Sequence, residues 1–160
     1  MGNDRPVVTI FGERVALGPL RPDHYPLHTR WVNDTEVGWN VFGLPQTRTL
    51  QQESEWLDSE LQGPHSLYFL IYAQDRWRPI GVTSLTAIDF RRGTATFRML
   101  IGDSADRGKG LGAEVGPLVQ AVARLPLRCP DGAEVRGTHA STRRPVDPFH
   151  RGRRGFEVVG

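Results

Sequence analysis

The sequence predicts a mixed α/β fold (α+β type) in which helices flank a largely antiparallel central sheet. Two strand–turn–strand patterns follow each other between residues 66 and 101, and consecutive hairpins pair neighbouring strands antiparallel. A strand, a glycine-rich loop and a helix then follow over residues 97–123. This order leaves little room for a doubly wound parallel sheet. The length of 160 residues fits one domain over residues 1–160.

The N-terminal part predicts a strand and a short helix. Two β-like runs, residues 7–10 and 14–20, flank a glycine and form the first strand with its lead-in. Asp23 is placed to cap a helix that runs to about Trp31, with a proline tolerated in the first turn. Three large apolar side chains of this region are expected in the core: Trp31, Val37 and Trp39.

The next helix has the clearest start signal in the chain. Thr49 followed by Gln52 fits a capping box, and a glycine and a proline after Gln62 end the helix. Its expected apolar face consists of Leu50, Trp56, Leu57 and Leu61. The histidines of this half lack metal-ligand spacing and are expected as surface or capping groups: His24, His28 and His65.

Three strands follow. The apolar run of residues 66–73 turns at Asp75-Arg76 into a run over residues 80–88. A second turn, Arg91-Arg92-Gly93, leads into residues 94–101. This meander delivers the chain to its most informative segment, the loop Arg107-Gly108-Lys109-Gly110-Leu111-Gly112.

This loop predicts an anion site. Its glycines leave backbone N–H groups unshielded, and a helix N-terminus supplies free donors and the positive end of a dipole. Arg107 and Lys109 are expected to add mobile positive charge at the rim. A nucleoside-triphosphate loop is excluded by the spacing and by the missing hydroxyl after the lysine. A dinucleotide fingerprint over Gly108-x-Gly110-x-x-Ala113 stays open but comes after several strands. A plain glycine turn between a strand and a helix also stays open.

Composition limits the function classes. The formal charge of +2 does not argue for nucleic acid, and nineteen of the twenty basic residues are arginine, with Lys109 the exception. No apolar stretch approaches the ~20 residues of a membrane span, and the N-terminus lacks signal-peptide character. Cys129 is the single cysteine, which excludes an internal disulfide and a thiolate zinc site. We expect a cytoplasmic protein with no metal, no membrane association and no nucleic-acid partner.

The loop resembles the pyrophosphate loop of the GNAT superfamily of N-acyltransferases, Q/R-x-x-G-x-G/A, which Arg107, Gly110 and Gly112 match. The order of further motifs is similar to the branch that acetylates ribosomal-protein N-termini, and the likeness covers roughly residues 14 to 124. These motifs are Leu20-Arg21-Pro22, Trp31-x-Asn33-Asp34, Pro79-Ile80-Gly81, Ile88-Asp89 and Gly102-Asp103.

The resemblance implies an acetyl-CoA-dependent N-acetyltransferase whose acceptor amine attacks the thioester directly. The acceptor would be a small-molecule amine or a protein N-terminus, and a homodimer stays open. The cofactor would lie against the backbone of Met99, Leu100 and Ile101 and against the amides of Arg107, Gly108, Lys109, Gly110, Leu111 and Gly112. The catalytic base is unknown: Asp34, Glu36 and a water relay are candidates. Many relatives carry Glu where this chain has Thr96, and often Gly where it has Arg98.

Residues 126–154 diverge from the family. They are rich in arginine, proline and glycine. Many relatives have a tyrosine that acts as the general acid for the leaving thiolate, and its position falls on Arg151 in this chain. The only candidate for a fifth strand is Ala133–Arg136, while Gly155-Phe156 resembles the start of the penultimate strand. This third of the chain resembles a damaged or truncated segment, so we expect poor order there and very low turnover. A catalytically inactive remnant is therefore the second hypothesis. An RNA-binding protein that uses the basic tail, or a dinucleotide-dependent oxidoreductase, is less favoured.

Overall fold

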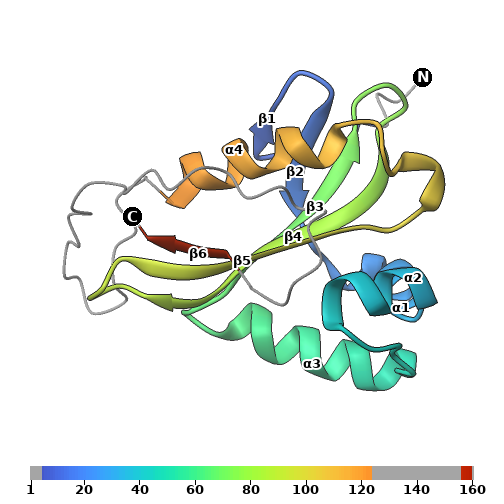
Figure 1. Ribbon diagram of the computed structural model, residues 1–160, viewed down its shortest axis with the longest axis horizontal. Coiled ribbons are helices and arrows are strands. Elements are labelled where there is room, and N and C mark those ends of the chain that lie inside the picture. Colours follow the sequence, from blue (N-terminus) through green and yellow to red (C-terminus); the bar gives the residue numbers. More distant parts are fainter. Residues whose placement is uncertain (1–4, 124–155, 160) are drawn as a thin grey trace.

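The computed structural model describes residues 5–123 and 156–159, and it confirms the mixed α/β fold with an antiparallel sheet (Figure 1). The six strands lie in the sheet in chain order, and every neighbouring pair is antiparallel. The strands are β1 (Ile10–Phe11), β2 (Val15–Pro19), β3 (Leu67–Ala73), β4 (Arg78–Asp89), β5 (Thr94–Ile101) and β6 (Phe156–Val159). The helices are η1 (Pro22–His24), α1 (Tyr25–Val32), α2 (Thr35–Val37), η2 (Gly38–Phe42), α3 (Leu50–Gln62), η3 (Ser104–Asp106) and α4 (Leu111–Ala123).

The two expected hairpins are present. Leu67 of β3 pairs with Leu85 of β4, and Gly81 of β4 pairs with Ile101 of β5. An irregularity follows Thr86 in β4, where Ala87 has a φ of 49°. Within residues 5–123 and 156–159, no helix combines the length and apolar character that crossing a bilayer requires.

Two hydrophobic clusters cover the two faces of the sheet. Helix α4 lies over one face, and helices α1, α2 and α3 lie over the other (Figure 1). Alternation along the strands assigns their side chains to these two faces. A register shift opposite Ile71 and Tyr72 interrupts it in β4, so Ile80 and Val82 lie in different clusters. The α4 side buries Val15, Leu17, Ile71, Ile80, Leu85, Val115 and Val119. The α1–α3 side buries Leu20, Trp31, Val37, Leu57, Leu70, Val82 and Leu100.

The first helix starts later than the sequence suggests. Asp23 lies in the 3-10 turn η1, and α1 begins at Tyr25 with Pro26 in its first turn. The prediction that Asp23 caps this helix was therefore wrong. The ring of His24 instead accepts a hydrogen bond from the Arg21 backbone N–H at 3.2 Å, which closes the turn. The expected strand about Gly12 is two strands, β1 and β2, joined by a tight turn.

The capping box of α3 is confirmed. The N–H of Gln52 donates to the Thr49 hydroxyl at 3.2 Å, and the Thr49 N–H donates to the Gln52 side chain at 3.0 Å. The predicted apolar face is only partly buried, because Leu57 is fully buried whereas Leu50 and Trp56 are 46% and 38% exposed.

Two other expectations for this helical layer need correction. Trp31 and Val37 are buried as expected, but Trp39 is 58% exposed. His28 is not a surface group: it is 4% exposed, and its Nδ1 lies 3.1 Å from Oε1 of the buried Glu53. Despite this short distance, Nδ1 of His28 makes no hydrogen bond with a described residue. Burial disfavours the Glu53 carboxylate, yet His28 and Arg48 together lower its pKa.

The last described strand, β6, pairs only with the first half of β5, from Thr94 to Phe97. Cys129, the proposed strand Ala133–Arg136 and the divergent residues 126–154 lie outside the described residues. The expectation that this segment is poorly ordered therefore stays a prediction.

Candidate active site

The loop between β5 and α4 begins with a close contact to α1. The N–H of Gly102 donates to the carbonyl of Ile80 at 2.8 Å, which continues the pairing of β4 and β5 for one more residue. A Cβ at this position would lie 2.1 Å from the indole ring of Trp31. Only glycine fits there, and the contact fixes the start of the loop against the helical layer. One residue later, Asp103 accepts a hydrogen bond from Arg30 of α1 at 3.1 Å.

Arg107 holds the loop to the end of β5. Its Nε donates to the carbonyl of Ile101 at 3.0 Å and its Nη2 donates to the carbonyl of Gly102 at 2.6 Å. The same guanidinium contacts α2, with Nη1 2.5 Å from Glu36 and Nη2 3.7 Å from Asp34. The side chain is only 19% exposed. The expectation of a mobile charge at Arg107 was therefore wrong, because four contacts fix the position of its side chain.

A buried carboxylate anchors the middle of the loop. Asp106 is 2% exposed and accepts two hydrogen bonds from the guanidinium of Arg78 at the start of β4. These bonds lower the pKa of Asp106 and raise the pKa of Arg78. Because the pair joins the loop to the central strand β4, it stabilises the loop conformation without using any of the loop's N–H groups.

A third contact ties the start of α4 to the turn between β1 and β2. Glu114 accepts hydrogen bonds from the backbone N–H groups of Arg14 at 2.8 Å and Val15 at 3.3 Å. Burial opposes ionisation of this carboxylate, but the backbone donors of Arg14, Val15 and Glu13 together with the Arg14 side chain outweigh it and lower the pKa of Glu114. The guanidinium of Arg14 also donates to the carbonyl of Lys109 at 3.0 Å. The carbonyl oxygen of Lys109 is thus turned toward an arginine side chain.

The N–H groups at the end of the loop have the geometry of an anion site. Gly108 and Gly110 have φ values of 72° and 77°, which are unstrained only for glycine. The 13-residue helix α4 follows, and the first N–H groups of any α-helix lack partners within it. Lys109 is exposed between the two glycines. Free donors, a helix dipole and a mobile ammonium group together favour a phosphate-like ligand.

The outer edge of β5 beside this loop is open. Because β6 stops at Phe97, residues 98–101 have no strand partner on that side within the described part of the chain. Met99 and Ile101 pack toward α4, and Leu100 is buried on the opposite face. An extended ligand can therefore pair with the backbone groups of this segment as a further strand would.

The predicted catalytic candidates lie on the α1–α3 side of the sheet. Asp34 caps α2 by accepting a hydrogen bond from the N–H of Val37 at 3.1 Å. Its side chain is 47% exposed, and that of Glu36 is 62% exposed. Arg107 brings both carboxylates to the end of β5, next to the loop. Of the six loop residues singled out from the sequence, Arg107 is the one shown to contact these two carboxylates.

Sequence reasoning missed the side chains that hold the loop in place: Arg14, Arg30, Arg78, Asp106 and Glu114. No local pattern marks them, because their partners are distant in sequence. Within residues 5–123 and 156–159, no group of three or more side chains is suited to hold a metal ion.

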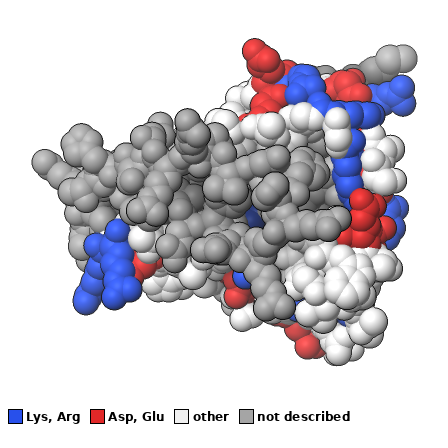
Figure 2. Space-filling model, in the orientation of Figure 1, with Lys and Arg blue, Asp and Glu red and all other residues white. Residues whose placement is uncertain are grey.

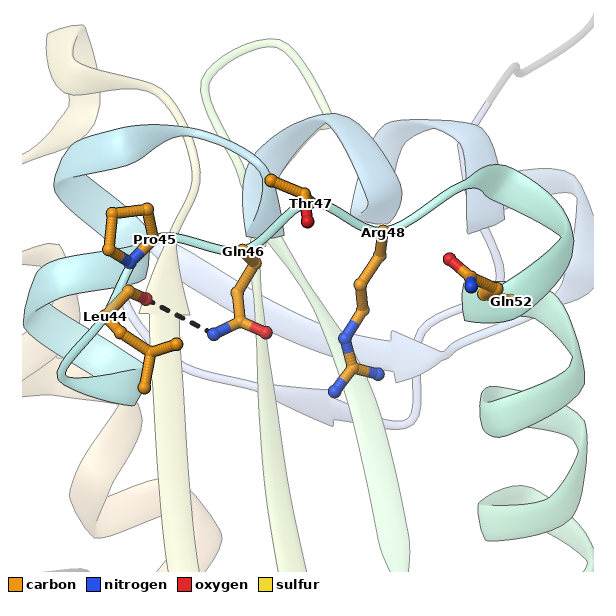
Figure 3. A pocket seen from close by; sticks show the side chains of 6 residues that line it. All are labelled: Leu44, Pro45, Gln46, Thr47, Arg48 and Gln52. Atoms are coloured by element: carbon orange, nitrogen blue, oxygen red, sulfur yellow. Dashed lines mark hydrogen bonds between the residues drawn. The ribbon is translucent and has the colours of Figure 1, made fainter.

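A shallow surface pocket lies apart from the loop. It is lined by Leu44, Pro45, Gln46, Thr47, Arg48 and Gln52, between η2 and the start of α3 (Figure 3). Its guanidinium, on Arg48, is committed to Glu53 at 3.2 Å and lies over the ring of Trp56. Because this guanidinium already has partners, the pocket adds no reactive group to the site. On the described surface visible in Figure 2, basic and acidic side chains lie next to each other in several places.

Comparison with known proteins identifies related folds. A family model, the acetyltransferase (GNAT) domain, matches residues 14–142. Among solved structures, spermidine N-acetyltransferase from Vibrio cholerae in complex with CoA and spermine aligns with a TM-score of 0.63 and 14% identity, over 69% of this chain and 63% of that chain. The ribosomal L7/L12 α-N-protein acetyltransferase RimL in complex with coenzyme A aligns with a TM-score of 0.58 and 16% identity, over 73% and 65%.

An acetyltransferase from Salmonella typhimurium that modifies the N-terminal serine of L7/L12 also aligns, with a TM-score of 0.58 and 15% identity, over 69% of this chain and 64% of that chain. The chain thus spans slightly less than two thirds of the length of each of these structures. The TM-scores show a shared fold, and the sequence identity is low. No curated protein sequence matches the chain significantly.

Proposed function

The chain belongs to the GNAT acetyltransferase domain family, and on that premise we propose that it is an N-acetyltransferase that acetylates a primary amine. Acetyl-CoA supplies the acyl thioester when it is bound. The observation that carries the proposal is the loop of residues 107–112, in which two left-handed glycines and a helix N-terminus present free N–H groups. The aligned spermidine N-acetyltransferase and RimL, which share this fold, were each solved in complex with CoA.

The donor set of the loop fits a pyrophosphate. The amides from Arg107 to Gly112 would hold the phosphate oxygens, and Lys109 would add a mobile positive charge. A branched side chain at Gly110 would both strain the backbone and fill the space that a phosphate needs. The salt bridges and hydrogen bonds made by Arg107, Asp106 and Glu114 fix the loop around this space.

The open edge of β5 fits the pantetheine arm. Gly102 donates to Ile80 of β4, so alternation turns the backbone groups of Leu100 to β4 and those of Met99 and Ile101 to the side that β6 leaves free, where the Ile101 carbonyl already accepts from Arg107. Amide groups of the arm would pair with them, and this would bring the acyl end toward the centre of the sheet. The residues then act mainly by positioning the amine and the acyl carbon, which is the largest contribution that a rigid site makes to such a transfer.

The proton of the attacking amine needs an acceptor, and three candidates remain. Asp34 and Glu36 lie at the end of β5 on the same side of the sheet. The contact of 2.5 Å between Glu36 and Arg107 competes with that role, so a water molecule held near Asp34 is an equal candidate. Thr96, where many relatives carry Glu, has no basic group. We place the reaction in the cytoplasm, and a homodimer stays compatible with it.

Calorimetric titration with CoA, NADP and RNA tests this function. We expect CoA alone to bind, and initial rates with acetyl-CoA and a panel of amines then separate an active enzyme from an inactive remnant. The panel includes spermidine and a peptide beginning with serine, the acceptors of the aligned enzymes. Binding of NADP in place of CoA would favour the oxidoreductase hypothesis, and binding of RNA alone would favour the basic-tail hypothesis.

A further inference from the structure

Arg98 ends a polar row that crosses three strands of the sheet. In the strand register, Tyr68 of β3 lies next to Ser84 of β4, and Ser84 lies next to Arg98 of β5. Phe97 and Met99 pack toward α4, so alternation directs Arg98 to the opposite face together with Leu100. This is the face covered by α1, α2 and α3, and Val37 of α2 packs in the same cluster as Leu100.

The charge of Arg98 is uncompensated in the described part of the chain. Seven described arginines each have a carboxylate within 4.0 Å, whereas no described carboxylate lies that close to Arg98. These seven are Arg14, Arg21, Arg30, Arg48, Arg78, Arg92 and Arg107. Of the other described arginines without such a partner, Arg76 and Arg91 lie in turns, and Arg5 lies over the rings of Phe11 and Trp77. Arg98 is exposed within strand β5.

An acid that acts on the same polar row, Glu60, already has partners. Glu60 of α3 accepts hydrogen bonds from the hydroxyls of Ser66 at 2.9 Å and Tyr68 at 3.3 Å. Burial and the Glu60 charge raise the pKa of Tyr68, while Arg98 acts in the opposite direction. The field of Arg98 therefore reaches the Tyr68 hydroxyl, although its guanidinium does not pair with Glu60.

The position of Arg98 relates this charge to the reaction. It is the first residue of the open half of β5, directly before the segment that would hold the acyl arm. We infer that Arg98 binds an anionic group of the acceptor, so that the preferred substrate is a primary amine with a carboxylate close to it. This inference rests on the proposed function. A polycationic acceptor such as a polyamine would be repelled by the same charge.

Matched acceptors measure this preference. One pair is two short peptide amides that differ only in Asp or Asn at the second position, and another is 3-aminopropanoate with its amide. Wild-type protein should favour each acid over its amide by about tenfold in kcat/KM, the size expected for one charge-assisted hydrogen bond. The two pairs distinguish a peptide N-terminus from a small amino acid as the source of the carboxylate.

Variants assign the preference to this residue. Arg98→Gln should reduce the acid-to-amide ratio to about one, chiefly by raising KM for the acid. Arg98→Lys should retain part of the ratio, because the charge remains. Arg91→Gln, an exposed arginine in the turn at the other end of the same hairpin, is the matched control and should keep the wild-type ratio.

Binding measurements keep the test independent of turnover. Each acceptor is titrated into CoA-saturated protein and into free protein, and the acid should bind about tenfold more tightly to wild type than to Arg98→Gln. Absence of CoA binding would refute the proposed function, whereas intact CoA binding with equal affinity for acid and amide would overturn only the role of Arg98. Loss of the ratio in the Arg91→Gln control would also overturn it.

Discussion

Replacing Gly110 with valine should weaken CoA binding far more than it destabilises the fold. Gly110 has a φ of 77°, where a β-branched residue costs about 1–2 kcal/mol. Its Cβ would lie 3.3 Å from Nη2 of Arg14, a side chain that is half exposed and can move. We therefore expect a loss of about 1–2 kcal/mol in unfolding free energy, or roughly 2–8 °C in Tm.

The effect on binding is larger because the variant displaces N–H donors. Each charge-assisted hydrogen bond to a phosphate contributes about 1.5–3 kcal/mol, so loss of one raises the Kd for CoA at least about tenfold. Gly43 provides a matched control, since its φ is 74° and no atom lies within 4 Å of its Cβ position. It ends η2, on the face of the sheet opposite α4.

Two assays separate the two effects. Thermal unfolding followed by circular dichroism should show similar losses for Gly110→Val and Gly43→Val. Calorimetric titration with CoA should show weaker binding for Gly110→Val alone. A folded Gly110→Val protein with a CoA affinity within about twofold of wild type would refute the assignment of this loop, and equal weakening in Gly43→Val would attribute the effect to stability.

Three further changes test the contacts around the loop and in the helical layer. Gly102→Ala places a methyl 2.1 Å from the buried Trp31 ring and should cost about 3 kcal/mol or more in urea unfolding; wild-type stability would contradict the packing. Asp106→Asn should cost about 2 kcal/mol at pH 7, discounted for the partial exposure of Arg78. Arg78 lowers the pKa of Asp106 in the folded state, so this stabilisation is fully present above the unfolded pKa of about 3.9 and is lost as pH falls through the folded pKa. The difference in unfolding free energy between Asp106→Asn and wild type should therefore shrink below about pH 4. Glu53→Gln should cost about 2–3 kcal/mol in thermal unfolding with CoA affinity unchanged, and weaker CoA binding would show that the helical layer controls the loop.

The sequence was sufficient where the determinants are local. The capping box of Thr49 and Gln52, the two hairpins and the glycine loop each depend on residues a few positions apart, and the structure confirms all three. The match of the loop to the family's pyrophosphate-loop pattern was also the basis for expecting acetyl-CoA as the cosubstrate.

Expectations that depend on distant partners were less successful. Trp39 and His28 have ordinary local contexts, and only the packing of α1 against α3 decides that His28 is buried beside Glu53 while Trp39 faces solvent. The sequence alone suggests that the Arg107 side chain is a mobile charge at the rim of the loop, because its partner Glu36 is 71 residues away. Burial and ion pairing of this kind follow from tertiary contacts, which composition and spacing do not encode.

The meander of β3, β4 and β5 also has a consequence for how the chain folds. Its pairings fall between Leu67 and Ile101, whereas β2 must close a loop from Pro19 to Leu67 before it can join the sheet. Shorter loops close at a lower entropic cost, so we expect the meander to form the folding nucleus. Truncation of Val82 to alanine should then slow folding, whereas truncation of Leu17 in β2 should chiefly speed unfolding in stopped-flow chevrons. The strand that leads into the cofactor loop would thus be paired before the first strands of the sheet dock on it.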